Sequence, residues 1–79
     1  MQAIKDFLNK IKWDKSLDAG DFVIYYLDNV SKKLEAVCFA DIKRTEGTFI
    51  AVEKEGEETF IPMHRIREVR EKDKIVWKR

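Results

Sequence analysis

One basic stretch, residues 61–79, carries the side chains of this sequence that are best suited to bind an anion. It holds the single His and the single Pro of the chain, and seven Lys or Arg residues against three acidic ones. Its chemistry is concentrated in four side chains that lie close together in the sequence: His64, Arg65, Arg67 and Arg70. The planar guanidinium of arginine suits bidentate contact with phosphate, and histidine can donate to a phosphate oxygen. The stretch therefore indicates a surface for a polyanion.

The charges of the chain are unevenly distributed along the sequence. Residues 46–60 carry five Glu against one Lys, while the whole chain has a net charge of only +1. Segregated charges let a nearly neutral domain present a basic field on one side. A structural interpretation stays open beside this one. Arg67 and Arg70 could instead pair with the neighbouring glutamates of a solvated face, and His64 could bond to the backbone.

No catalytic, metal or cofactor site is predicted from the residue inventory. One His and one Cys cannot form a zinc site alone, and the acidic residues are scattered through turns without metal-binding spacing. The three glycines are isolated, so no phosphate-binding loop can be assigned. Phosphoesterases that use a pair of histidines are excluded by count. We therefore expect a binding module without enzymatic activity.

Aromatic side chains could add base stacking to the basic stretch. Four rings are candidates: Trp13, Tyr25, Tyr26 and Trp77. Rings of this kind stack on nucleobases in single-strand binders, but a domain this small also needs them in its core. Tyr26 is the ring that we include in the candidate RNA-binding set.

The length of 79 residues predicts a single domain that spans residues 1–79. The apolar runs are too short to cross a bilayer, and the first residues interleave charged with apolar side chains, unlike a secretory signal. We therefore expect no membrane partner and a cytoplasmic location.

The first twelve residues predict an amphipathic helix. Its apolar positions follow the helical spacing i, i+3, i+4 and i+7: Ile4, Phe7, Leu8 and Ile11. A core this small needs that apolar face, so we expect the helix to pack against a sheet.

The middle of the chain predicts strands joined by turns. Residues 22–28, 34–42, 48–53 and 59–61 are rich in β-branched and aromatic residues, and Gly, Asn or Asp falls in the turns between them. This order indicates an antiparallel meander.

Residues 62–72 admit two structures. Met63, Ile66 and Val69 are spaced by three, and Pro62 suits the first turn of a helix. We favour a 3₁₀ turn over 62–65 followed by strands at 66–71 and 74–78. The predicted fold is α+β: the N-terminal amphipathic helix packed on a curved, mainly antiparallel sheet of five to six short strands, which could close toward a barrel.

Twelve positions give the chain a family resemblance: Trp13, Asp14, Asp18, Tyr26, Asp41, Ile42, Pro62, His64, Arg65, Ile66, Val76 and Trp77. The sequence resembles the RNA cyclic group end recognition domain, a family of small archaeal proteins formerly classed as uncharacterised. Lys15 departs from the family pattern, which has Pro there, and so do Lys72 and Asp73, where Gly is common. Both departures lie in predicted turns.

The resemblance implies recognition of RNA ends that bear a cyclic phosphate, in RNA processing or repair. It also implies association with an RNA ligase or a phosphoesterase. His64 and Arg65 would then hold the phosphate at the 3′ end of a single strand. Phosphates further along would be contacted by Arg67, Arg70, Lys78 and Arg79. We rank a non-catalytic RNA-binding module first, a protein-interaction or structural module second, and an RNA end-processing enzyme third.

Overall fold

The structure is a computed structural model that describes residues 3–79, apart from the side chain of Lys54. Within that range the chain forms one α-helix, seven strands and three short 3₁₀ turns, so the α+β prediction is confirmed. The elements in chain order are α1 (Ile4–Trp13), η1 (Ala19–Asp21), β1 (Phe22–Leu27), β2 (Leu34–Cys38), η2 (Phe39–Asp41), β3 (Ile42–Thr45), β4 (Phe49–Lys54), β5 (Glu57–Pro62), η3 (Met63–Arg65), β6 (Ile66–Glu71) and β7 (Lys74–Lys78).

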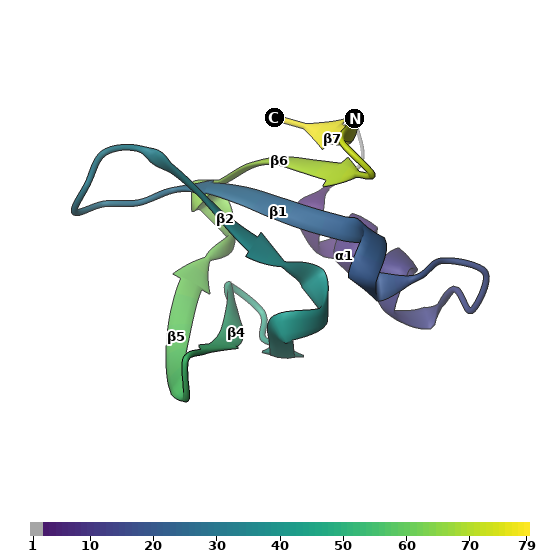
Figure 1. The fold of residues 1–79 in the computed structure, drawn as a ribbon, viewed down its shortest axis with the longest axis horizontal. Helices are drawn as coiled ribbons and strands as arrows, with labels where there is room; N and C mark the ends of the chain where they lie inside the picture. The colour runs from purple at the N-terminus through teal and green to yellow at the C-terminus, as the bar shows by residue number, and fades with distance from the viewer. Residues whose placement is uncertain (1–2) are drawn as a thin grey trace.

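The strands form two antiparallel sheets. A four-stranded sheet has the order β2-β1-β6-β7, and a three-stranded sheet has the order β3-β4-β5. Figure 1 shows β1 and β6 running together at the top of the molecule, with β4 and β5 below them. No strand pairing within residues 3–79 joins the two sheets. The prediction of a sheet that closes toward a barrel is therefore wrong.

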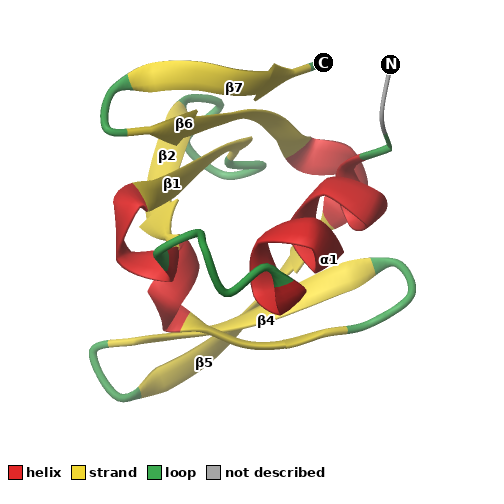
Figure 2. Ribbon diagram, turned by 90° about the vertical axis from the view of Figure 1, so that its right-hand side faces the viewer, coloured by secondary structure: helices red, strands yellow, loops and turns green. Residues whose placement is uncertain are grey.

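Helix α1 closes the side of the core between the two sheets (Figure 2). Its four predicted apolar residues are all buried: Ile4, Phe7, Leu8 and Ile11. The periodicity argument thus located the helix, which ends at Trp13, one residue beyond the predicted range. Residues 1–2, the predicted start of the helix, lie outside the described residues.

The strand predicted over residues 34–42 is instead two strands separated by the turn η2. Phe39 is buried, and Ile42, three positions later, packs against the core. Strand geometry cannot place both side chains inward at that spacing, but one 3₁₀ turn can. β2 therefore leaves one sheet and β3 enters the other, which gives seven strands instead of five or six. The single meander is also wrong, since only β3, β4 and β5 form one.

Residues 62–72 adopt the favoured structure, and the helical alternative is wrong. Met63–Arg65 forms the 3₁₀ turn η3, and Ile66–Glu71 forms β6. Met63 and Ile66 are both buried. The spacing by three that suggested a helix therefore arises from one turn joined to one strand.

The turns η2 and η3 form two corners where the chain passes between the sheets, and the two corners have the same backbone design although the sequence shows no internal repeat. Each carries one strand out of one sheet and into the other through a 3₁₀ turn that starts at a buried side chain, Phe39 or Met63. Each is followed by a register shift that leaves one extra residue, Lys43 in β3 and Arg67 in β6. Such bulges bend a strand and change the direction of its side chains.

One row of buried side chains crosses the four-stranded sheet: Val37, Ile24, Val69 and Trp77. These residues face α1 and the three-stranded sheet, and they fix the register because a shift by one residue would expose all of them. Among the described residues, no helix is long and apolar enough to cross a membrane.

Candidate nucleic-acid interface

The turn η3 presents two of the predicted site residues at the surface. Met63 and Ile66 anchor its ends in the core, and the Met63 amide donates to the Thr48 carbonyl at 2.9 Å. Between these anchors His64 is exposed and Arg65 is half-buried. The turn is thus fixed by its backbone and its apolar ends, which leaves both polar side chains available.

Arg79 braces this turn from the other end of the described chain. Its guanidinium donates through Nε to the Ile66 carbonyl at 3.1 Å and through Nη2 to the Met63 carbonyl at 3.2 Å. Its backbone amide donates to the Arg67 carbonyl at 2.9 Å. Arg79 was predicted to contact RNA phosphate, but two of its donors are already used inside the protein. That contact stays a prediction.

A groove of about 380 Å³ opens beside η3. It is lined by Tyr26, Leu27, Asp28, Asn29, Thr59, Phe60, Ile61, Pro62 and Arg65. Tyr26 reaches it because β1 pairs with β6, with Tyr26 opposite Ile66. Phe60 is 52% exposed, a high value for a large aromatic side chain. The volume falls within the usual range of small-molecule sites.

The phenol of Tyr26 is one of the polar groups that line this groove. Burial raises its pKa above the ordinary value, and the nearby carboxylates of Asp28 and Glu35 raise it further. Tyr26 is therefore protonated at neutral pH and can donate a hydrogen bond to a ligand.

The basic side chains around the groove differ in whether they are already paired. Arg65, His64 and Arg67 make no ion pair or side-chain hydrogen bond with the described residues. Asp28, the acidic residue of the groove, accepts from the Val30 amide and the Ser31 hydroxyl. Arg65, His64 and Arg67, which have no partners among the described residues, can therefore bind an anion at η3 and the start of β6.

Arg70 lies on the outer face of the four-stranded sheet, away from the groove. Its Nε donates to Glu68 at 2.6 Å, and its guanidinium lies 4.6 Å from the centre of the Tyr25 ring. The hydrogen bond to Glu68 raises the pKa of Arg70. Lys78, opposite Glu68 in the register, is exposed and has no described partner. Tyr25 and Tyr26 are successive strand residues on opposite faces, so the predicted set divides between two surfaces.

The similar corner at η2 has its charges neutralised. Lys43 pairs with Glu53, and Arg44 pairs with Glu46 and Glu58. These glutamates come from the acidic segment noted in the sequence, which forms most of the three-stranded sheet. The two corners therefore share a backbone plan, but only η3 offers cations without described partners.

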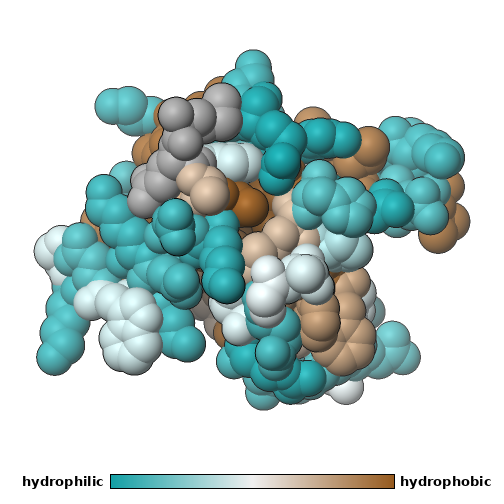
Figure 3. Space-filling model, turned by 180° about the vertical axis from the view of Figure 1, so that it is seen from behind, coloured by the Kyte–Doolittle hydropathy of each residue, from teal (hydrophilic) through white to brown (hydrophobic). Residues whose placement is uncertain are grey.

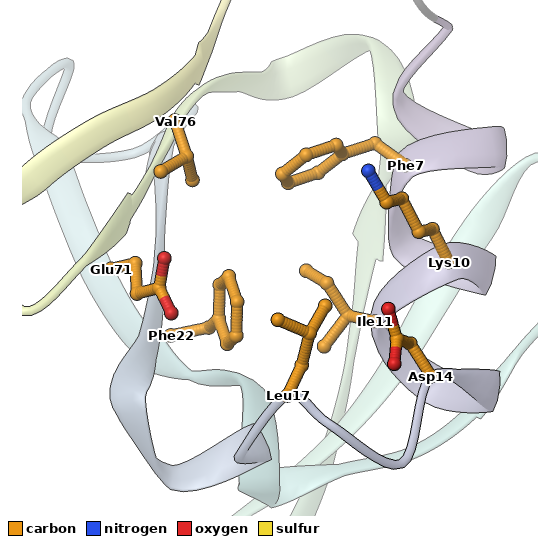
Figure 4. Close-up of a pocket in the computed structure, with 8 residues that line it drawn as sticks. All are labelled: Phe7, Lys10, Ile11, Asp14, Leu17, Phe22, Glu71 and Val76. Carbon is orange, nitrogen blue, oxygen red and sulfur yellow. The ribbon is translucent and has the colours of Figure 1, made fainter.

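A second cavity, of about 310 Å³, lies between α1 and the end of the four-stranded sheet (Figure 4). Its walls are mostly apolar, from Phe7, Ile11, Leu17, Phe22 and Val76. Figure 4 shows the Glu71 carboxylate and the Lys10 amine entering from opposite sides, with Asp14 below Lys10. Two carboxylates against one amine make this cavity less suited to a phosphate than the groove at η3.

The exposed apolar side chains do not gather on one element. Among residues 3–79 the large ones are Trp13, Val30, Leu34, Phe60 and Ile75, which come from α1, the β1–β2 loop, β2, β5 and β7. Seen from behind, hydrophilic residues cover most of the surface, and apolar residues show between them in several places (Figure 3). Trp77, one of the four candidate stacking rings, is buried. Exposed apolar side chains that are scattered singly in this way are common on protein surfaces.

Sequence reasoning missed three parts of the groove: Phe60, Asp28 and Asn29. Phe60 precedes the basic stretch by one position, but the sequence pattern indicated only that it belongs to a strand. Asp28 and Asn29 were assigned only to a turn.

Among the described residues, no three His, Cys, Asp or Glu side chains gather to hold a metal ion.

The fold and the groove together define a small α+β binding domain with a basic turn beside an aromatic groove. The chain belongs to the family described as the MJ1316 RNA cyclic group end recognition domain, whose model matches residues 1–79. The resemblance drawn from the sequence is thereby confirmed. The description names a recognition role, and it names RNA.

Relatives cover nearly the whole chain. A UPF0248 protein of Saccharolobus solfataricus is 33% identical over 79 residues, covering 96% of this chain and 95% of its own length. A UPF0248 protein of Metallosphaera sedula is 34% identical over 76 residues, covering 96% of this chain and 91% of its own. No solved structure matches the chain.

Proposed function

We propose that this protein binds the 3′ end of single-stranded RNA at the turn η3, prefers ends that carry a cyclic phosphate, and does not cleave them. One observation carries the proposal. Arg65 lines a groove with Tyr26 and Phe60 while making no ion pair with the described residues. A guanidinium beside aromatic side chains is suited to hold a phosphate next to a nucleobase. The family description supports the same role.

The chemistry of the RNA end accounts for the preference. A cyclic phosphodiester has one negative charge and two non-bridging oxygens, whereas a 3′-hydroxyl end has neither at that position. Arg65 gains charge-assisted hydrogen bonds only with the former. His64, exposed on the same turn, is the second donor.

Phosphates upstream of the end would be contacted by exposed cations near the turn. Arg67 is the second residue of β6, which follows η3, and Lys78 lies on β7 beside β6. Contacts of this kind give affinity without sequence preference. A role in RNA processing or repair, a cytoplasmic location, and an RNA ligase or phosphoesterase as partner belong to the same proposal.

The test is a titration of short labelled RNAs that differ only in the terminal group. Arg65→Ala should weaken binding of the cyclic end by about 1.5–3 kcal/mol, roughly 10- to 150-fold, and leave the hydroxyl end nearly unchanged. Lys43→Ala is the control, because Lys43 is a cation just after the similar turn η2, pairs with Glu53 and does not line the groove. Equal affinity of the wild type for both ends would reject end recognition.

A second measurement addresses catalysis. Cyclic-phosphate RNA incubated with the protein should return with its end unchanged. Turnover that persists through purification and disappears in His64→Ala would show that the protein is an enzyme.

A further inference from the structure

We infer that the groove beside η3 reads the terminal base of the RNA and prefers guanine. The terminal nucleotide reaches this groove only if the RNA end binds at η3, so the preference rests on the proposed function. The observations that lead to it are the shape of the groove, its apolar walls and the polar groups of its rim.

The groove has room and walls for one nucleobase. Its volume of about 380 Å³ suits a ligand the size of a mononucleotide. The rings of Tyr26 and Phe60 and the side chain of Pro62 come to it from β1 and β5. Phe60 stands edge-on to Phe49, with ring centroids 5.1 Å apart, which supports it from one side. Aromatic and proline side chains give a base a flat apolar surface for stacking.

Arg65 fixes the direction in which a nucleotide would enter. It is the cationic residue among the groove's lining residues, and it lies next to His64 at the turn. The phosphate of the nucleotide therefore belongs beside Arg65. The polar groups left for the base are those of Asp28 and Asn29, which line the same groove at the start of the β1–β2 loop.

Asp28 retains acceptor capacity after its contacts within the loop. One carboxylate oxygen accepts from the Val30 amide at 3.1 Å, and the other accepts from the Ser31 hydroxyl at 3.3 Å. A carboxylate offers about four lone-pair positions, so roughly two remain. The loop bonds also hold the carboxylate in place. The neighbouring Asn29 has no described side-chain partner and supplies an amide donor.

A carboxylate beside an amide donor matches the Watson–Crick edge of guanine. Guanine presents two adjacent donors, the ring N–H and the exocyclic amine, which a carboxylate can accept together, and a carbonyl that an amide can donate to. Uracil presents one ring N–H between two carbonyl oxygens, and those oxygens would face the carboxylate. Adenine and cytosine present an amine but no adjacent ring donor, so they rank between the two.

The experiment titrates the protein with 2′,3′-cyclic GMP, AMP, CMP and UMP and follows binding by calorimetry or amide chemical shifts. The wild type should bind the guanine nucleotide about tenfold or more tightly than the uracil nucleotide. Asp28→Asn, which keeps an acceptor for the Val30 amide, should remove that difference. The control is Asp18→Asn, because Asp18 accepts from the Gly20 amide in a similar turn outside the groove.

The outcomes separate the base preference from end recognition. Equal affinity for all four cyclic nucleotides, or a guanine preference that survives Asp28→Asn in a folded variant, would overturn the base preference while leaving end recognition standing. RNAs ending in G or U with plain hydroxyl ends provide the converse test. A guanine preference there, without any preference for the cyclic end, would support the groove assignment and reject the preference for cyclic phosphates.

Discussion

The guanidinium of Arg79 donates to the carbonyl of Met63 at 3.2 Å, sixteen positions earlier in the chain. Its second contact, to the Ile66 carbonyl, places one side chain across both ends of the turn that carries His64 and Arg65. The Met63 carbonyl also accepts the Ile66 amide within the turn, so the guanidinium adds a side-chain donor to a carbonyl at the start of the turn and to the one just after it. Arg79 is thus positioned to set the geometry of the candidate site through the backbone of the turn.

Arg79→Ala should reduce the preference for the cyclic end, because the turn loses two of its anchors. The free energy of unfolding should fall by about 1–2 kcal/mol. Arg79→Lys should not restore the preference, since an ammonium cannot reproduce the fork of the guanidinium. Paired titrations of cyclic and hydroxyl ends, with thermal unfolding of each variant, provide the measurement. Lys78→Ala is the neighbouring control, and an Arg79→Ala protein with full end preference would contradict the bracing role.

Arg67→Ala should flatten the salt dependence of RNA binding by about 0.7 in log–log slope, the value for one single-strand phosphate contact. Arg67 is exposed and has no described acidic partner. Arg70 was predicted from the sequence to make the same kind of contact, but its guanidinium is engaged by Glu68 and Tyr25. We therefore expect Arg70→Ala to leave the slope unchanged. A slope that falls equally in both variants would restore the sequence-based prediction for Arg70.

Tyr26 should make stability depend on pH in alkaline solution. Its pKa is raised above the ordinary value of 10.0 in the folded protein. The folded state therefore holds the phenol proton more tightly than the unfolded chain does. This contribution to stability is fully present below about pH 10 and is lost as pH rises through the folded pKa. Denaturant unfolding of the wild type and Tyr26→Phe should show a shallower alkaline decline in the variant, and parallel curves would refute the shift.

Asp73→Gly should stabilise the protein by about 0.5–1 kcal/mol, which for a domain of this size corresponds to several degrees in melting temperature. Lys72 and Asp73 both have positive φ, at 50° and 70°, in the turn between β6 and β7. The β4–β5 turn has the same geometry but places Gly56 at the second position, with φ 81°. Such turns favour glycine there. Gly56→Ala should lower the melting temperature, and stabilisation by that change would contradict the explanation.

Local patterns in the sequence were enough to predict α1 and the η3–β6 segment. The helix has an apolar stripe with a polar opposite face, and a strand at 66–71 was favoured because the apolar run 75–77 after Lys72 and Asp73 is typical of the return strand of a hairpin. The break at η2 was missed because residues 34–42 are all compatible with a strand. Only the existence of a second sheet requires Phe39 and Ile42 to turn inward three positions apart.

Part of the candidate site could be anticipated because His64 and Arg65 are neighbours in the chain. The groove could not, since Tyr26 and Phe60 come together only through the pairing of β1 with β6 and the corner at η3. Nor could the role of Arg79, because its acceptors are backbone carbonyls, which every residue has. The ion pair of Arg70 with Glu68 was an open alternative, and it forms because residues two positions apart in β6 lie on the same face of the sheet.

The pairing of β1 with β6 also bears on the order in which the protein assembles. β3, β4 and β5 follow one another in the chain, so their sheet can form through short loop closures. β6 must pair with β1 across the whole intervening segment. Such long-range pairing stabilises the protein only after the entropy cost of closing the long loop has been overcome. The η3 turn is completed by that late step. A nascent or partly unfolded chain would therefore have its three-stranded meander before it could hold an RNA end.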